Sequence, residues 1–123
     1  MKQDLDFSAE LELTAGKYKA ALEARIDFGV PPPNALATIM KKGHDLTLRD
    51  SWDYRNSIEV RITPTEAEVG VFHPRIAEYV FWNEHGTKRI PARPVFGPVA
   101  DGPGEQFLDE LEEALADKII ENF

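Results

Sequence analysis

The chain of 123 residues contains no cysteine. This absence excludes disulfide bonds, thiolate catalysis and cysteine metal sites, and it is compatible with a reducing cytoplasm. Long apolar runs are also missing, because the longest one, Tyr79–Trp82, has about four residues where a membrane-spanning helix needs about twenty. Residues 1–6 lack the apolar stretch of a secretory signal. We therefore expect a soluble, intracellular protein that has no membrane partner.

Basic residues are outnumbered, since 14 Lys and Arg face 22 Asp and Glu and give a formal net charge of −8. Most of this imbalance lies in residues 99–123, which hold eight acids and one base, Lys118. DNA affinity comes largely from Lys and Arg that neutralise phosphates, so an acidic surface repels duplex DNA. The acids of this segment are either a solvated helix face or a surface that keeps DNA from sticking.

The residue patterns of known catalytic and metal sites are missing too. His44, His73 and His85 are the only histidines, and none of them has a close ligand partner at the i, i+4 spacing of a zinc protease. Ser51 lies in no nucleophile-elbow sequence, and the glycines of residues 97–104 alternate with prolines and acids rather than with the bases of a phosphate loop. We expect no enzyme activity, no metal and no cofactor.

Hydrophobic periodicity predicts the elements of the first half. Residues 4–13 alternate strictly between polar and apolar side chains, which is typical of a half-buried strand. Helical spacing begins after residue 16 and predicts a helix over 17–27, which Gly29 and the prolines 31–33 end. The next expected elements are a short helix over 35–42, N-capped by Asn34, and an irregular segment over 44–52.

The clearest element is a predicted β-hairpin over residues 57–72. Pro64-Thr65 forms its turn, and apolar residues alternate along both arms. Its core-facing residues are expected to be Ile58, Val60, Ile62, Ala67, Val69 and Val71.

Residues 75–84 are predicted to form a helix that ends at Gly86, with an aromatic strand as the alternative. Apolar residues cover most of its circumference, so it is buried either in the core or against another subunit. Three prolines predict an extended segment over 88–98, and an acidic amphipathic helix follows over about 105–122. Together the patterns predict one α+β domain of residues 1–123, in which a small antiparallel sheet (N-terminal strand plus central hairpin) packs with about four helices.

Several of these segments occur in an order that resembles a known family. Glu84–Thr87 forms an acidic-x-Gly-Thr step, and Pro91–Pro94 forms a Pro-Ala-Arg-Pro step that Phe96 follows after Val95 rather than directly. Residues 31–43 and the Arg-Asn-Ser-Ile step at 55–58 are similar to the stretch before the family's hairpin. This ordered set resembles the phage neck and tail-component family of small virion proteins. Related tail-completion proteins share the Ile-Pro-Ala-Arg-Pro step, so both positions in the particle stay open.

The resemblance implies a structural protein in the head–tail connector (neck) or tail-terminator ring of a long-tailed phage. Such a ring joins head to tail and lets DNA pass. The implied partners are further copies of the chain, in a ring of six or twelve, the neighbouring connector or adaptor and tail-tube proteins, and DNA only in non-specific passage. The implied location is the head–tail junction of the virion, and the host cytoplasm during assembly. Two alternatives are a transient assembly factor and a small nucleic-acid-binding module.

A closed ring needs heterologous interfaces, and the aromatic helix and the proline-rich arm after it offer two surfaces for them. The arm can instead pack on its own core. The predicted subunit-interface residues are Tyr79, Phe81, Trp82, Gly86, Thr87, Arg89, Pro91, Arg93, Pro94 and Phe96. The predicted lumen-facing acids are Glu105, Asp109, Glu112 and Glu113. As an alternative, Lys88, Arg89 and Arg93 beside Trp82 could bind nucleic acid, although the acidic total favours pairing with carboxylates.

Overall fold

The computed structural model describes residues 6–29, 53–88 and 91–121. The elements in chain order are α1 (Ser8–Phe28), α3 (Asp53–Asn56), β1 (Ile58–Ile62), β2 (Ala67–Val71), α4 (Pro74–His85), α5 (Phe96–Asp101) and α6 (Pro103–Glu121). The described part is mostly helical with a two-stranded antiparallel sheet, so the predicted α+β class is confirmed. The helix predicted over 35–42 and the irregular segment over 44–52 lie outside the described residues.

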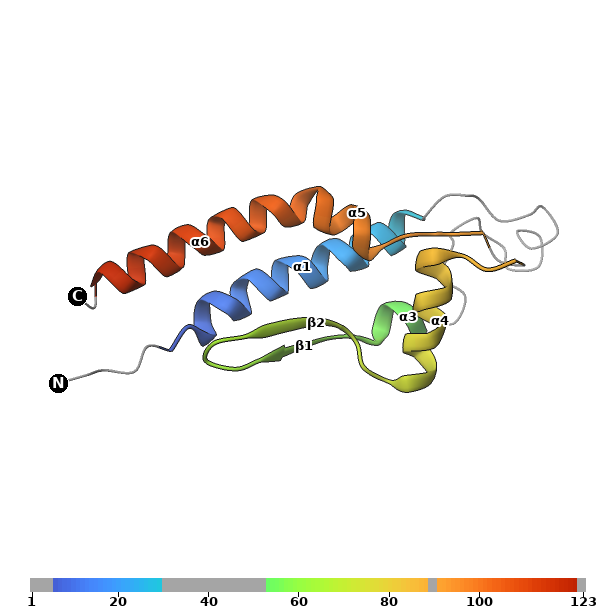
Figure 1. The fold of residues 1–123 in the computed structure, drawn as a ribbon, viewed down its shortest axis with the longest axis horizontal. Helices are drawn as coiled ribbons and strands as arrows, with labels where there is room; N and C mark the ends of the chain where they lie inside the picture. The colour runs from blue at the N-terminus through green and yellow to red at the C-terminus, as the bar shows by residue number, and fades with distance from the viewer. Residues whose placement is uncertain (1–5, 30–52, 89–90, 122–123) are drawn as a thin grey trace.

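Helix α1 is the centre of the arrangement. Figure 1 shows α6 along one side of α1 and the β1–β2 hairpin along the other, with α4 at one end of the long axis. Helices α1 and α6 run antiparallel, because Lys17 Nζ lies 2.6 Å from Glu110 and Lys118 Nζ lies 2.9 Å from Glu10. The Tyr18 and Phe107 rings meet edge to face between them, with centroids 5.8 Å apart. Apolar contact and ion pairs together fix α6 on α1.

The predicted N-terminal strand is wrong, since residues 8–13 form the first turns of α1. The carboxylate of Asp6 accepts the Ser8 amide hydrogen at 2.8 Å, and the next residues are good helix formers with no β-branched side chain before Thr14. The buried residues of α1 are Leu11, Ala15, Leu22 and Ile26. Their spacing is helical, and Leu13 is 64% exposed. The buried apolar stripe runs along the whole of α1, from Leu11 to Ile26. Burial of this stripe therefore outweighs the polar–apolar alternation of residues 4–13.

The hairpin is confirmed, but Ala67, one of its expected core-facing residues, is exposed. Strands β1 and β2 pair antiparallel, with Ile58 opposite Val71 and Val60 opposite Val69. The Thr63 amide donates to the Glu66 carbonyl oxygen at 2.8 Å and closes the turn. These cross-strand apolar pairs lie on the face that α1 covers, where Val69 and Val71 pack against the core.

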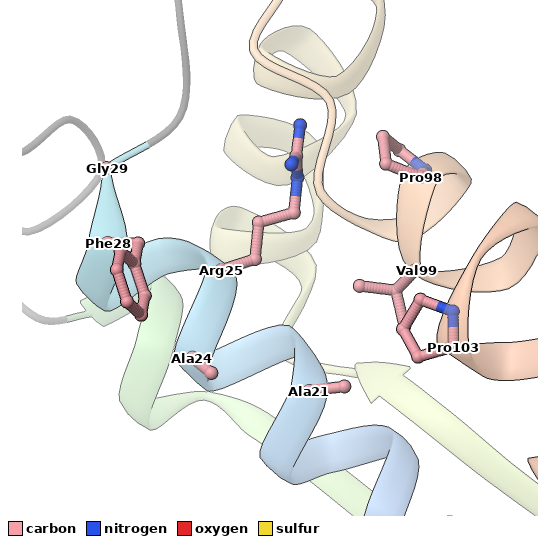
Figure 2. Close-up of a pocket in the computed structure, with 8 residues that line it drawn as sticks. All are labelled: Ala21, Ala24, Arg25, Phe28, Gly29, Pro98, Val99 and Pro103. Carbon is pink, nitrogen blue, oxygen red and sulfur yellow. The ribbon is translucent and has the colours of Figure 1, made fainter.

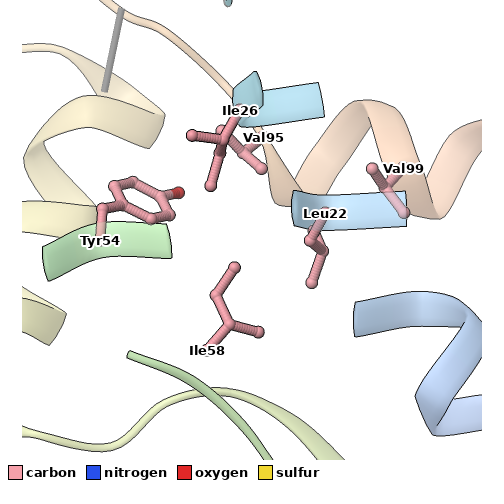
Figure 3. Close-up of a cluster of buried hydrophobic side chains, with 6 residues drawn as sticks. All are labelled: Leu22, Ile26, Tyr54, Ile58, Val95 and Val99. Atoms are coloured by element: carbon pink, nitrogen blue, oxygen red, sulfur yellow. The ribbon is translucent and has the colours of Figure 1, made fainter. Parts of the chain in front are cut away.

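Six buried side chains form the core, which Figure 3 shows between α1, α3 and the α5 segment. They are Leu22, Ile26, Tyr54, Ile58, Val95 and Val99. Helix α3 falls where no element was predicted, and it brings Tyr54 into this core. Arg55 on α3 pairs with Asp27 on α1 at 2.8 Å, and this contact raises the pKa of the Arg55 guanidinium.

The extended segment predicted over 88–98 is wrong at its end, because Phe96–Asp101 is helix α5. Pro98 is in the first turn of α5, where the missing amide hydrogen has no intrahelical acceptor to lose. Helix α6 follows after Gly102 and confirms the predicted C-terminal helix, two residues longer at its start. Gly104 packs directly on α1: a Cβ there would lie 2.7 Å from Tyr18 Cζ and 2.6 Å from the Val99 oxygen. Only glycine allows α1 and α6 to approach this closely.

Candidate functional site

Helix α4 exposes three aromatic side chains, Tyr79, Phe81 and Trp82, on a broad surface that also includes Glu78, and we call this surface the aromatic face. The three aromatic side chains are 40%, 61% and 40% exposed in the single chain. The Phe81 ring contacts His85 one turn later, with ring centroids 4.6 Å apart. Exposing three aromatic side chains of one helix to water is unfavourable for a monomer. Exposed apolar surface of this kind commonly marks an interaction site.

Local sequence fixes the ends of α4. Pro74 stands in the first turn, where its fixed φ favours helix initiation. At the other end Gly86 adopts a φ of 80° and donates its amide hydrogen to the Trp82 oxygen at 2.7 Å. A positive φ favours glycine, so Gly86 both ends the helix and turns the chain into the segment that follows.

The inner face of α4 is tied to the proline-rich arm through Asn83, which is buried. The Asn83 side-chain amide donates to the Tyr79 oxygen at 2.9 Å, and its backbone oxygen accepts the Arg93 amide hydrogen at 2.5 Å. A buried amide needs such partners, because an unpaired one costs about 1–3 kcal/mol. Asn83 therefore holds the backbone of the arm against α4.

The next residue forms a second tie, which we call the Glu84 clamp. One carboxylate oxygen of Glu84 accepts the amide hydrogens of Val95 at 2.8 Å and Phe96 at 3.0 Å, and the other accepts that of Gly97 at 3.0 Å. The first amides of a helix have no intrahelical acceptor, and a negative charge is favourable there. Glu84 on α4 therefore caps α5, although the amides that it binds lie eleven to thirteen positions later in the chain.

Two side chains connect this arrangement to the core. Arg25 on α1 donates from Nε to the Pro94 oxygen at 2.8 Å. The Tyr54 ring packs edge to face on Tyr79, with centroids 6.3 Å apart. Burial raises the pKa of Tyr54, and the nearby negative charge of Glu84 raises it further. The buried Tyr54 hydroxyl has no hydrogen-bond partner among the described residues, so it stays protonated and packs as a hydrophobic ring.

The structure separates the predicted interface residues into three groups. Tyr79, Phe81, Trp82, Thr87 and Pro91 are exposed. Gly86, Arg93, Pro94 and Phe96 are half-buried, and Phe96 packs against the core of its own chain. Arg89 lies outside the described residues. The sequence left open whether the arm packs on its own core or on another subunit. The end of the arm, at Phe96, packs on the core of its own chain. Pro91 and the aromatic face of α4 are exposed. A role of each residue in an interface stays a prediction.

The predicted lumen-facing acids, Glu105, Asp109, Glu112 and Glu113, are all exposed on α6. Their helical spacing places them on one side, whereas Phe107 and Glu110 contact α1 on another. All six exposed ionisable side chains of α6 are acidic. The helix therefore presents a surface of one sign to its surroundings.

Two hollows lie along α1. The first, which we call the apolar groove, has a volume of about 320 Å³ and lies between α1, β2 and α6. Its lining residues are Leu11, Thr14, Ala15, Tyr18, Thr65, Glu66, Ala67, Val69, Phe96, Leu108 and Leu111. The second, of about 290 Å³, lies where α1 meets the α5–α6 joint. Figure 2 shows it with Phe28 on one wall, Pro98, Val99 and Pro103 on the other, and Arg25 between them.

Sequence patterns alone missed the polar contacts that build this region. Glu84 belongs to the acidic-x-Gly-Thr step, but its role as an amide acceptor depends on residues eleven to thirteen positions later. Asn83 directly follows the apolar run Tyr79–Trp82 and precedes Glu84, so nothing in the order of residues indicates that it is buried. His73 precedes the first residue of α4 and the His85 ring contacts that of Phe81 at a tilt of 51°, while His44 lies outside the described residues.

Over residues 6–29, 53–88 and 91–121, no three His, Asp or Glu side chains are grouped to hold a metal ion. In the same part of the chain, no helix combines the length and the apolar character that crossing a membrane requires. Comparisons with protein-family models, with curated proteins and with solved structures found no match to this chain.

Proposed function

We propose that this chain is a structural subunit of the ring that joins head and tail in a long-tailed phage or prophage, at the neck or the tail terminus. The observation that carries the proposal is the exposed aromatic face of α4, within the segment whose sequence resembles the neck and tail-component family. A ring subunit covers such a face with another copy or with a neighbouring virion protein.

The rigidity of the site supports this proposal. The Glu84 clamp and the Asn83–Arg93 hydrogen bond fix the path of the chain from α4 to α5. Surfaces that are ordered before they bind lose less conformational entropy on docking. The aromatic face is therefore presented on a fixed helix, as an assembly contact requires.

The charge of α6 supports passage of DNA rather than its binding. Exposed acids repel phosphates, and we propose that Glu105, Asp109, Glu112 and Glu113 line the lumen. Other copies, in a ring of six or twelve, the adjacent connector or adaptor and tail-tube proteins, and DNA in passage are the proposed partners. The proposed location is the head–tail junction, with the host cytoplasm as the site of assembly.

The test is a phage that lacks this protein, complemented with plasmid-borne variants. Without the chain, electron microscopy should show full heads and separate tails, and the wild-type chain should restore joined particles. Phe81→Ser should restore fewer joined particles than the matched control Leu13→Ser, which alters a similarly exposed apolar residue on α1. Mass spectrometry should find the wild-type chain in purified particles. Its presence in lysates but absence from particles would instead identify a transient assembly factor and overturn the proposal.

A further inference from the structure

We propose that the aromatic face of one copy of this chain docks on the second hollow of a neighbouring copy, with Glu78 of α4 paired to Arg25 of α1. This inference rests on the proposed ring and names the contact that joins its subunits. The two surfaces belong to different elements, α4 on one side and α1 with the α5–α6 joint on the other. Pairing of unlike surfaces is heterologous, and it continues from copy to copy until a ring closes.

The second hollow combines apolar walls with one positive charge, and we call it the Arg25 hollow. Arg25 is the only charged residue among the described residues that line it. Phe28 on one wall is 88% exposed, more than any other large apolar side chain in the described part of the chain. Pro103 on the opposite wall is also exposed, and Figure 2 shows Arg25 between the two walls. This surface fits a partner that combines apolar side chains with a carboxylate.

Arg25 has hydrogen-bond donors left for that carboxylate. The guanidinium of an arginine carries several N–H donors in a fixed fork, and carboxylates bind it through parallel hydrogen bonds. Among the described residues, the side chain of Arg25 uses only its Nε, which donates to the Pro94 oxygen at 2.8 Å. This bond holds the half-buried side chain in place before a partner binds, so less conformational entropy is lost on docking.

The aromatic face supplies the carboxylate. Glu78 precedes Phe81 and Trp82 by three and four positions, so helix geometry places it between the two rings. Glu78 is exposed, and no ion pair is found for it among the described residues. Glu84, one turn after Phe81, adds negative charge, whereas Lys88 lies beyond the end of the helix. The centre of the face is therefore aromatic and acidic, which is the chemistry that the Arg25 hollow accepts.

The base on the same side of α4 also finds an opposite charge. Arg75 stands in the first turn of α4, one turn before Glu78. On the partner's surface, the exposed Asp101 lies one turn after Pro98, which is a wall residue of the Arg25 hollow. A second pair between Arg75 and Asp101 would set the direction in which α4 lies across the hollow.

The apolar groove is a poorer partner for the same face. Glu66 is the only charged residue among the described residues that line it. Docking of α4 there would bring Glu78 and Glu84 toward a charge of the same sign. Like charges at an interface cost affinity, so the Arg25 hollow is the better partner of the two.

Charge reversal on each side of the contact tests the pair. Self-association of the purified chain is measured by sedimentation velocity over a series of concentrations, and the wild-type chain should form oligomers. Glu78→Lys places a base against Arg25, and Ala24→Glu places an acid in the hollow against Glu78. Each change should weaken association at least about tenfold. Ala24 is exposed on α1 and lines the hollow, so its replacement leaves the Arg25–Pro94 hydrogen bond intact.

Matched variants carry the same charge changes away from the contact. Glu12→Lys and Ala20→Glu alter exposed residues of α1 that are not among those described as lining the hollow, and both should associate like wild type. The double variant, Glu78→Lys with Ala24→Glu, pairs the new base with the new acid. It should therefore associate at least about tenfold more strongly than either single variant. Thermal unfolding followed by circular dichroism checks that every variant is folded.

Three results would overturn the inference. The first is a wild-type chain that stays monomeric throughout the series. The second is Ala24→Glu that associates like wild type, which is expected if two aromatic faces pair with each other. The third is a double variant no stronger than the single ones. If any of these occurs while the wild-type chain is present in purified particles, the proposed ring stands and only this contact is rejected.

Discussion

The Glu84 carboxylate accepts the amide hydrogen of Gly97 at 3.0 Å, although the two residues are thirteen positions apart in the chain. The contact joins α4 to α5, and α5 leads directly into α6. The orientation of the aromatic face relative to the acidic helix therefore depends on this side chain together with the Asn83–Arg93 hydrogen bond. This relationship makes the Glu84 clamp the first target for mutation.

Glu84→Gln keeps the size of the side chain but replaces one acceptor oxygen with a donor amide. The clamp then loses charge and at least one of its three hydrogen bonds, and hydrogen bonds to charged groups contribute about 1.5–3 kcal/mol. We expect the free energy of unfolding to fall by about that amount in urea titrations. Glu78→Gln, on the exposed side of the same helix, should change it by less than about 0.5 kcal/mol. Equal effects of the two changes would contradict the role of the clamp.

Gly104→Ala should destabilise the protein, because the new methyl group would overlap Tyr18 and the Val99 oxygen. Overpacking of this kind costs about 1–3 kcal/mol. Gly16→Ala is the matched control, since no atom lies within 4 Å of a Cβ at that helical position. Alanine favours a helix by about 0.5–1 kcal/mol over glycine, so this variant should be more stable than wild type. Thermal unfolding should therefore move in opposite directions for the two glycines.

The ion pair between Lys118 and Glu10 should make stability depend on pH. The hydrogen bond from Lys118 lowers the pKa of Glu10 below its ordinary 4.5. A carboxyl whose pKa is lower in the folded state stabilises the protein above its unfolded pKa, and that contribution disappears as the pH falls through the folded pKa. The melting temperatures of wild type and Lys118→Met should therefore differ at neutral pH, and the difference should shrink as the pH falls below 4.5 through the lowered pKa of Glu10.

A charge-matched control separates this pair from the loss of a positive charge in general. Lys19→Met removes the same charge from α1, where no carboxylate partner is found among the described residues. Its melting temperature should stay closer to that of wild type at neutral pH. If the Lys118→Met difference persisted unchanged through acid pH, the pair would not be its cause.

Replacing Glu105, Asp109, Glu112 and Glu113 with their amides should leave folding intact, because all four are exposed. Asp109 lies one turn from each of the other three. Relief of like-charge repulsion should even raise stability slightly. If the acids face the lumen, the variant should still join heads to tails, but DNA should leave the particle more slowly and infectivity should fall. Glu12, Glu59, Glu66 and Glu68, exposed outside α6, provide a control set with the same number of charges. Equal infectivity of the two sets would contradict a role of α6 in DNA passage.

Several elements were predictable because their signals are local. The hairpin follows from alternation on both sides of Pro64-Thr65, and α4 follows from Pro74 at its start and Gly86 at its end. The helical spacing of apolar residues in the sequence also predicts α6. Each of these elements is specified by neighbours within a few positions, so the chain order contains the information.

The errors arose where distant residues decide between local options. Residues 4–13 fit a strand by alternation, yet helix propensity and the stripe from Leu11 to Ile26, which α6 and the hairpin cover, favour α1. Residues 96–101 contain glycine and proline and fit an extended segment, yet the carboxylate of Glu84 caps their amides and favours α5. In both places the local preference is weak, and burial or a charged acceptor from elsewhere outweighs it.

The sequence by itself determined the α+β class, the hairpin register, the acidic character of α6 and the aromatic content of α4, because composition and periodicity act at short range. Only the tertiary structure decided which aromatic side chains stay exposed and which polar groups hold the arm. Exposure depends on what packs against a surface, and a hydrogen bond such as that between Glu84 and Gly97 exists only after the chain has brought its two partners together.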